Sequence, residues 1–248
     1  MLTLLRQELY KQIHGKFYIG WGIVILAISL LSGYFYHNGS AAMSATNSSA
    51  RMFSNGLAMA LVAMIVFASS LLTSDFSNNT IKYLFARQFS RGQILISKLI
   101  ITVLMFVYLV IVAFIAAGIG NILFNEARPF LWSDMLPYLI GMSFYLFLMI
   151  PIVLLISNIF KSNAVAIAIG LVFYFVSNVI NVFLNILMDK FEWIKYNPLN
   201  FLNILRQYSI HEYSQLSRLS LPQLEVGTII WGIIILVITY LVYNHRNV

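Results

Sequence analysis

The sequence contains no cysteine and very few charged residues. Among its 248 residues, 9% are charged and 60% are hydrophobic, and the mean hydropathy is +0.86. Without cysteine, the chain can form neither a disulfide bond nor a thiolate metal site. So few charged side chains cannot cover the surface of a water-soluble globule of this length. The composition therefore predicts an integral membrane protein.

Long stretches of the sequence lack aspartate, glutamate, lysine and arginine altogether. Six of them are long enough to cross a bilayer, which takes roughly 20 helical residues. Continuous apolar runs favour helices, because the strands of a membrane barrel alternate their exposure over about ten residues. We therefore predict an all-α membrane protein with six transmembrane helices near Phe17–Tyr36, Met52–Thr73, Leu99–Phe124, Leu136–Phe160, Ala164–Leu184 and Gly227–Tyr243.

The predicted spans contain no histidine either. Ionisable side chains inside a membrane usually mark proton or ion pathways, so their absence argues against a proton-coupled carrier, an intramembrane metalloprotease and a voltage sensor. His14, His37, His211 and His245 lie in loops and flanks, without the H-E-x-x-H spacing of a metal site. No G-x-S-x-G motif accompanies the serines of the spans. We predict no catalytic residue, no metal site and no enzymatic activity in this chain.

A nucleotide-binding P-loop is also missing. The pattern G-x-x-x-x-G-K-[ST] does not occur, and Gly15-Lys16 is followed by Phe17 instead of serine or threonine. The chain therefore cannot bind and hydrolyse ATP by that route. If it moves a solute uphill, the energy must come from a partner.

The charges that remain are distributed unequally between the two sides of the predicted membrane. With both termini in the cytoplasm, the inner segments carry the whole net charge of +7 and the outer segments are neutral. Because inner loops are usually the positive ones, we predict that both termini are cytoplasmic. Nucleic-acid binding is an alternative, but these charges lie at membrane flanks, where they serve topology and contact anionic lipid. The first apolar run could also be interpreted as a signal peptide, but it is longer than the 7–15 residues that are typical of the apolar core of such a peptide.

Residues 1–16 precede the first span and are predicted to form an amphipathic helix. Leu2, Leu5, Leu9 and Ile13 share one helical face. Such a helix suits a position in the inner membrane interface. A plain basic flank is the alternative.

The segment from Asp75 to Lys98 is a polar stretch between two long apolar runs. Leu84 and Phe85 follow Ile81 at helical spacing, which predicts a short amphipathic helix. Ser90 and Gln93 fit a capping box, which predicts the start of the next helix. We expect the segment to dock a cytoplasmic partner, and its basic residues are Lys82, Arg87, Arg91 and Lys98.

Two features of the spans have both a structural and a functional interpretation. Pro151 lies within the fourth span, where it removes one backbone hydrogen bond and should kink the helix. The kink could act as a hinge or only affect packing. The fifth span carries Asn178, Asn181 and Asn185 on one stripe beside Ser177. Amides in hydrocarbon need partners, so this stripe either joins helices or forms the polar edge of a translocation path.

The segment 185–226 is the longest polar stretch on the outer side. Its charges balance, yet Phe191, Trp193, Phe201 and Leu205 are spread through it. This composition is too apolar for a disordered loop and too charged for a span. We predict short helices that rest on or dip into the outer leaflet, broken near Asn197-Pro198.

These features together resemble the permease subunit of an ABC-2 type transporter. In that family the inner segment between spans two and three reads acidic-x4-Thr, apolar residues, Pro-x-Ser-Arg and a later lysine. Asn79 and Gln88 stand where the family usually has glycine and proline. The resemblance covers the whole chain as architecture and about two dozen residues as motif, and the matching positions are Asp75, Thr80, Leu84, Ser90, Arg91 and Lys98.

The resemblance implies a half-transporter, in which residues 1–248 form a single transmembrane permease domain. Two such chains would form a homodimer and engage separate ABC ATPase subunits, which bind ATP and Mg²⁺; the permease itself would hold no cofactor. Residues 1–16 would be an elbow helix, 74–93 the cytoplasmic coupling segment, and 185–226 the outer re-entrant helices. The residues implied for ATPase coupling are Asp75, Thr80, Ile81, Leu84, Phe85, Arg87, Ser90 and Arg91. The residues assigned to the path are Ser177, Asn178, Asn181 and Asn185.

The expected path walls are apolar and bear amides but no ring of charges, which suits an amphipathic or lipid-like cargo. Similarity to small six-span exporters of peptides, bacteriocins and toxins in Gram-positive bacteria favours an amphipathic peptide. Lipid-linked polysaccharide and hydrophobic drugs are the alternative cargoes. Two other classes also stay open: a non-transporting membrane anchor subunit, and an integral-membrane enzyme, which the missing ionisable residues disfavour.

Overall fold

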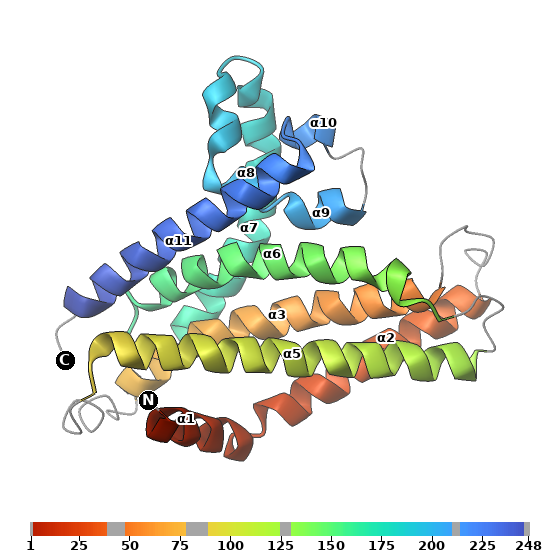
Figure 1. Cartoon of the computed structure of the whole chain (residues 1–248), viewed down its shortest axis with the longest axis horizontal. Coiled ribbons are helices and arrows are strands. Elements are labelled where there is room, and N and C mark those ends of the chain that lie inside the picture. Colours follow the sequence, from red (N-terminus) through yellow and green to blue (C-terminus); the bar gives the residue numbers. More distant parts are fainter. Residues whose placement is uncertain (1, 39–47, 78–88, 125–129, 210–213, 246–248) are drawn as a thin grey trace. The chain divides into compact units, whose positions relative to one another are not determined.

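The computed structural model describes residues 2–38, 48–77, 89–124, 130–209 and 214–245, and the regular elements in these ranges are all helices (Figure 1). Six of these helices are long and apolar enough to cross a membrane. The prediction of an all-α membrane protein with six spans is therefore confirmed. The six are α2 (Phe17–Asn38), α3 (Ser48–Ser77), α5 (Arg91–Leu123), α6 (Trp132–Ser157), α7 (Asn163–Met188) and α11 (Leu221–His245).

Most of these helices extend beyond the charge-free runs that predicted them. Helix α5 begins at Arg91 and includes Lys98, while α3 includes Asp75 and α11 includes Glu225. Charged residues can lie near the ends of a spanning helix because their side chains reach the polar interface or find a buried partner. The expectation that the spans contain no ionisable residue therefore holds only for the central parts of these helices.

The chain divides into two compact units. The first comprises Met1–Met64 and Ile96–Leu139, and the second comprises Ile65–Leu95 and Ile140–Val248. The boundaries fall inside α3, α5 and α6, so each of these helices contributes residues to both units. The two units are described separately below.

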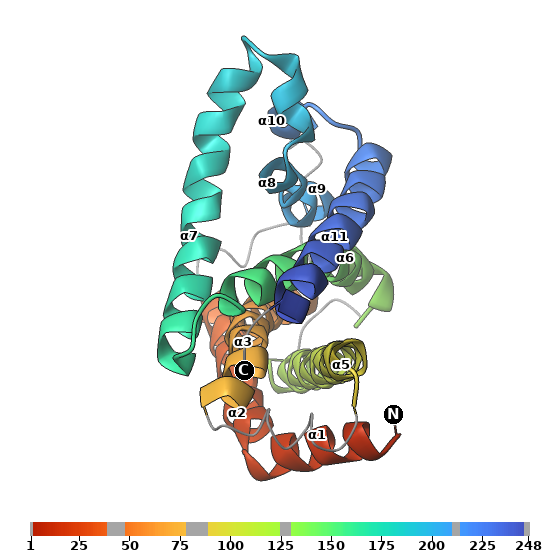
Figure 2. The ribbon, with the colours of Figure 1, turned by 90° about the vertical axis from the view of Figure 1, so that its left-hand side faces the viewer.

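In the first unit, α1 (Leu2–His14) is joined to α2 by a tight turn. Lys16 adopts a left-handed conformation with φ 53°, and the N–H of Gly15 donates to the carbonyl of Lys11 at 3.0 Å. Figure 2 looks along α5 and shows α1 running crosswise to it. The N-terminal segment is thus a separate helix, as predicted, with its own direction.

The two faces of α1 have different surroundings. Leu4 and Glu8 are buried, whereas Leu2, Leu9 and Ile13 on the predicted apolar face are exposed. Apart from Leu5, which is half-buried, this apolar face therefore does not pack against the described residues of the chain. An exposed apolar face is what a helix in the membrane interface requires, and that location stays a prediction.

Small residues let α2, α3 and α5 approach one another closely. A Cβ added to Gly56 would lie 2.6 Å from Ser29 Oγ and 3.0 Å from Ala113 Cβ. Asn121 Nδ2 donates to Ser49 Oγ at 2.8 Å across the same group of helices. Small side chains and interhelical hydrogen bonds are the usual means of packing helices in membranes.

In the second unit, four short helices connect α7 to α11. They are η2 (Glu192–Tyr196), α8 (Pro198–Phe201), α9 (Ile204–Ser209) and α10 (Ser214–Ser217). Asn197 caps α8 by accepting from the N–H of Leu199 at 2.9 Å, and Pro198 is the first helical residue. Figure 2 shows α8 and α9 between α7 and α11. The predicted short helices and the break near Asn197-Pro198 are confirmed by these elements.

Helix α6 continues through Pro151 to Ser157. Proline has no N–H, so the carbonyl of Phe147 loses its partner four residues later. A Cβ added to Gly232 of α11 would lie 3.1 Å from this carbonyl oxygen. The absence of a side chain at Gly232 thus allows α11 to pack closely on α6. On the same two helices, Thr239 Oγ1 donates to the carbonyl of Pro151 at 3.2 Å.

Candidate functional site

The coupling segment ends in a capping box at the start of α5. The N–H of Gln93 donates to Ser90 Oγ at 3.2 Å, and the N–H of Ser90 donates to Gln93 Oε1 at 3.1 Å. These reciprocal bonds satisfy two backbone donors that a helix start otherwise leaves without partners. The predicted capping box is confirmed, and it defines where α5 begins.

Arg91, the first residue of α5, contacts the end of α11. Its Nη1 donates to the carbonyls of Tyr243 at 2.9 Å and Asn244 at 2.7 Å. The last carbonyls of a helix lack internal partners and carry the negative end of its dipole. A guanidinium is therefore well placed there, and Arg91 joins the end of the coupling segment to the end of α11.

A buried ion pair joins α1 to α5. Lys98 Nζ lies 3.4 Å from Glu8 Oε1, and the side chains are 1% and 6% exposed respectively. The other carboxylate oxygen of Glu8 is buried without a hydrogen-bond partner among the described residues. Charges buried in this way are held by their pairing, because each would be costly to bury alone. The pair lies about two helical turns after Arg91.

Only three of the eight predicted coupling residues lie in the described part of the chain. Asp75, near the end of α3, is buried, and Ser90 and Arg91 make the contacts given above. The predicted amphipathic helix and the two departures from the family motif lie outside the described residues. Those positions are Asn79, Thr80, Ile81, Leu84, Phe85, Arg87 and Gln88.

The amide stripe of α7 reaches the short helices of the same unit. Asn181 Nδ2 donates to the carbonyl of Leu199 at 2.8 Å, and Asn178 Oδ1 accepts from Arg206 Nη2 at 3.1 Å. These contacts fit the interpretation that the stripe joins helices. Ser177 bonds within α7, to the carbonyl of Tyr174 at 2.8 Å.

Two amide oxygens of the stripe remain without donors. Asn181 Oδ1 and Asn185 Oδ1 are both buried, and neither accepts a hydrogen bond from any residue that the structure describes. An unpaired buried acceptor costs about 1–3 kcal/mol. A translocation path would give such oxygens a use, so the path assignment of Ser177, Asn178, Asn181 and Asn185 stays a prediction.

A buried network of amides and one hydroxyl holds the short helices together. Asn200 Nδ2 donates to the carbonyls of Lys195 at 2.8 Å and Ser217 at 2.9 Å. Gln207 Oε1 accepts from Ser217 Oγ at 3.0 Å, and Asn203 Nδ2 donates to Asn200 Oδ1 at 2.9 Å. Buried polar networks with paired members give a segment one defined conformation. The network therefore fixes the described short helices relative to one another.

Charged and aromatic groups tie this segment to α7 and α11. Arg218 donates to the carbonyl of Met188 at 3.0 Å and to the carboxylate of Asp189. The hydroxyl of Tyr208 donates to Glu225 on α11. Burial raises the pKa of Tyr208 above its usual value, and the hydrogen bond and the negative charge of Glu225 raise this pKa further.

The sequence analysis did not identify several of these contacting residues, although local patterns in the sequence point to some of them. Glu8 follows Leu4 by four residues, so the two share a helical face. Ser220 and Gln223 repeat the S-x-x-Q spacing of the capping box, and the N–H of Ser220 donates to Gln223 Oε1 at 3.0 Å. The partners of these residues were not predictable, because they come from distant segments.

The polar groups described above join helices to one another. In the described ranges no three His, Asp or Glu side chains come together as a metal site would require. At the start of α5, Arg91 instead contacts α11, and Lys98 contacts α1. Such connections suit the transmission of movement, which needs rigid elements and fixed contacts.

Comparisons with known proteins identify the family. The model of the ABC-2 family transporter protein matches residues 4–177. The matched residues run from α1 into α7 and include the Asp75–Lys98 segment. A comparison with curated proteins found no match. Because the family model covers more than half of the chain, the protein belongs to the ABC-2 family of transporter proteins.

Proposed function

We propose that this chain is the membrane permease subunit of an ATP-driven ABC exporter. A separate ATPase subunit binds ATP and Mg²⁺ and supplies the energy, and the chain itself catalyses no reaction. Membership of the ABC-2 family, in a chain with six spanning helices and no P-loop, is the observation that carries the proposal. The protein then provides the translocation path for the cargo across a bacterial cell membrane.

The ATPase docks on the cytoplasmic segment between α3 and α5. The excess of basic residues on this side supports its cytoplasmic position. Leu84 and Phe85 supply the apolar contacts, with Arg87 and Arg91 beside them. Because α5 begins at a capping box and Arg91 bonds to the end of α11, force on this segment reaches two spanning helices directly.

Two copies of the chain form the complete path. In the most apolar stretches of α7 and α2, only 17% and 22% of the residues are buried within the chain. These helices therefore leave large apolar surfaces for lipid or for a second permease. In a homodimer, two such apolar surfaces pack against each other. Polar residues are not required at this interface, because close van der Waals contact is enough to hold helices together in a membrane.

The cargo is an amphipathic peptide. Apolar helix surfaces favour its apolar side chains, and the amides of the α7 stripe provide polar groups for its backbone. Lipid-linked polysaccharide and hydrophobic drugs are the competing cargoes. Binding of labelled candidates to the purified complex distinguishes them.

Co-purification tests the proposed docking segment. The chain is expressed with each ABC ATPase subunit of its host, and Leu84→Asp with Phe85→Asp is expected to abolish recovery of the complex. The matched control is Phe191→Asp with Leu216→Asp, because these two residues are exposed and lie in the segment between α7 and α11. Survival of the complex, and of ATP-dependent transport in vesicles, in the first variant would contradict the assignment.

A further inference from the structure

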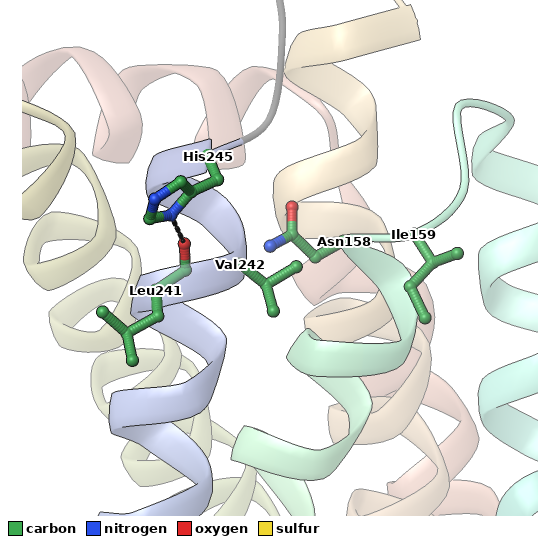
Figure 3. Close-up of a pocket in the computed structure, with 5 residues that line it drawn as sticks. All are labelled: Asn158, Ile159, Leu241, Val242 and His245. Carbon is green, nitrogen blue, oxygen red and sulfur yellow. Dashed lines mark hydrogen bonds between the residues drawn. The ribbon is translucent and has the colours of Figure 1, made fainter.

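An open groove of about 510 Å³ lies between the end of α6 and the last turns of α11, within the second unit. Figure 3 shows its five lining residues, which are Asn158, Ile159, Leu241, Val242 and His245. The groove is separate from the amide stripe of α7 and from the short helices. No contact described above assigns it a function.

The lining of the groove is amphipathic along α11. Leu241 and Val242 lie about one turn before His245, and together with Ile159 they form what we call the apolar wall. His245 Nδ1 lies 2.9 Å from the carbonyl of Leu241, to which it donates when protonated there. In Figure 3 the other ring nitrogen points away from this bond. The groove thus offers an apolar surface with a polar group at the helix end.

Two basic residues adjoin the lining residues of the groove, one through its hydrogen bonds and one in the sequence. Two helix C-termini meet there, and their carbonyls alone would repel an anion. Arg91 offsets this, because its guanidinium donates to the carbonyls of Tyr243 and Asn244. Lys161 is exposed two residues after Ile159. We call Arg91, Lys161 and His245 the basic rim.

Described carboxylates of the second unit lie away from this rim or are buried. Glu225 is twenty residues before His245 on α11, which corresponds to about 30 Å along a helix. Asp189 and Glu192 follow the opposite end of α7, and Asp75 is buried. Among the described residues of the second unit, basic residues therefore adjoin this groove and no exposed carboxylate does.

We propose that this groove binds one anionic phospholipid. Its phosphate lies at the basic rim and its acyl chain follows the apolar wall. Basic pockets between spanning helices on the cytoplasmic side are suited to anionic lipid headgroups. Because Arg91 belongs both to the rim and to the start of α5, a bound lipid also supports the end of the coupling segment. The proposal needs no ATPase, so it can be tested separately from the proposed function.

Lipid retention by the purified full chain tests the site. The chain is released from nanodiscs of equimolar phosphatidylglycerol and phosphatidylcholine with identical acyl chains, and bound lipid is counted by native mass spectrometry. We expect one phosphatidylglycerol per chain to be retained in preference to phosphatidylcholine. Lys161→Glu and His245→Glu should each lower this retention at least five-fold, whereas Lys190→Glu, an exposed lysine just after α7, should leave it unchanged.

A second variant addresses the apolar wall without a change of charge. Val242→Trp fills the groove and should also lower phosphatidylglycerol retention, with the unfolding midpoint of each variant measured as a check of folding. Equal retention of the two lipids, or an equal loss in Lys190→Glu, would show annular contact only and overturn the proposal. Displacement by free glycerol phosphate would assign a simple anion site instead. Loss of the ATPase with unchanged lipid retention would assign the groove to a protein partner.

Discussion

Lys98 on α5 and Glu8 on α1 form an ion pair of 3.4 Å from which water is almost entirely excluded. Ninety residues separate the two in the sequence. The pair fixes the crosswise helix α1 to α5 near the end of the coupling segment. Because both charges are buried, removal of Lys98 leaves the Glu8 carboxylate buried without its ion-pair partner.

Loss of Lys98 alone should therefore be more harmful than loss of both charges of the pair. Lys98→Met is expected to lower the free energy of unfolding by about 3–5 kcal/mol, whereas Glu8→Met with Lys98→Met should cost less, because no carboxylate of this pair is then left buried alone. Denaturant unfolding of the full chain in detergent measures this. The exposed pair Glu192–Lys195, at 3.9 Å, is the control, and Lys195→Ala should cost about 1 kcal/mol or less. Equal costs in both pairs would contradict the buried role of Glu8 and Lys98.

The capping box at the start of α5 gives a second prediction. Ser90→Ala removes the acceptor of the Gln93 N–H and should destabilise this helix start by about 1 kcal/mol. Hydrogen exchange of the Gln93 amide should become faster. Ser90→Asp keeps an acceptor at the cap and serves as the control; faster exchange in both variants would show that the side-chain oxygen does not protect this amide.

Local features of the chain were predictable from its sequence, and distant pairings were not. Ser90 and Gln93 are three residues apart, so their spacing alone predicted their contact. The Glu8–Lys98 pair depends on how α1 lies across α5, and the face of α1 that turns inward carries Leu4 and Glu8 instead of the leucines at positions 2 and 9. Helix packing decided this orientation, and helical spacing does not encode it.

The spans and the amide stripe also combine a local feature that the sequence predicts with distant contacts that it does not predict. The runs without charge located all six spanning helices, but the start of α5 was predicted too late, because Arg91 and Lys98 belong to this helix and find partners inside the fold. The sequence identified Asn181 as a residue in need of a partner. That partner is the carbonyl of Leu199, and a backbone carbonyl in a short, irregular segment leaves no recognisable pattern in the side chains.

Arg91 provides a third prediction, which concerns the end of α11. Arg91→Ala removes donors from the carbonyls of Tyr243 and Asn244, so the last turn of α11 should fray and its amides should exchange faster. Arg91→Lys keeps the charge at the helix end and should have a smaller effect. Lys190→Ala, at an exposed lysine after α7, is the control variant. An unchanged exchange rate in Arg91→Ala would contradict the capping role.

The contact between Tyr208 and Glu225 predicts a dependence on pH. Burial and Glu225 raise the pKa of Tyr208 above its ordinary value of 10.0, so the folded chain retains a proton that the unfolded chain loses. The stabilisation is complete below about pH 10 and is lost as the pH rises further. Unfolding midpoints between pH 8 and 11 should therefore fall less in Tyr208→Phe than in the wild type. Tyr196→Phe is the control, and identical slopes in wild type and Tyr208→Phe would refute the linkage.

The central claim is that the segment between α3 and α5 faces the cytoplasm, where a separate ATPase acts on it. Since the chain has no cysteine, a single introduced cysteine is a unique label site. Intact cells carrying Gln88→Cys or Ser44→Cys are treated with a membrane-impermeant maleimide, before and after permeabilisation. The account predicts immediate labelling at position 44 and labelling at position 88 only after permeabilisation. Labelling of position 88 in intact cells, at the rate seen for position 44, would contradict it.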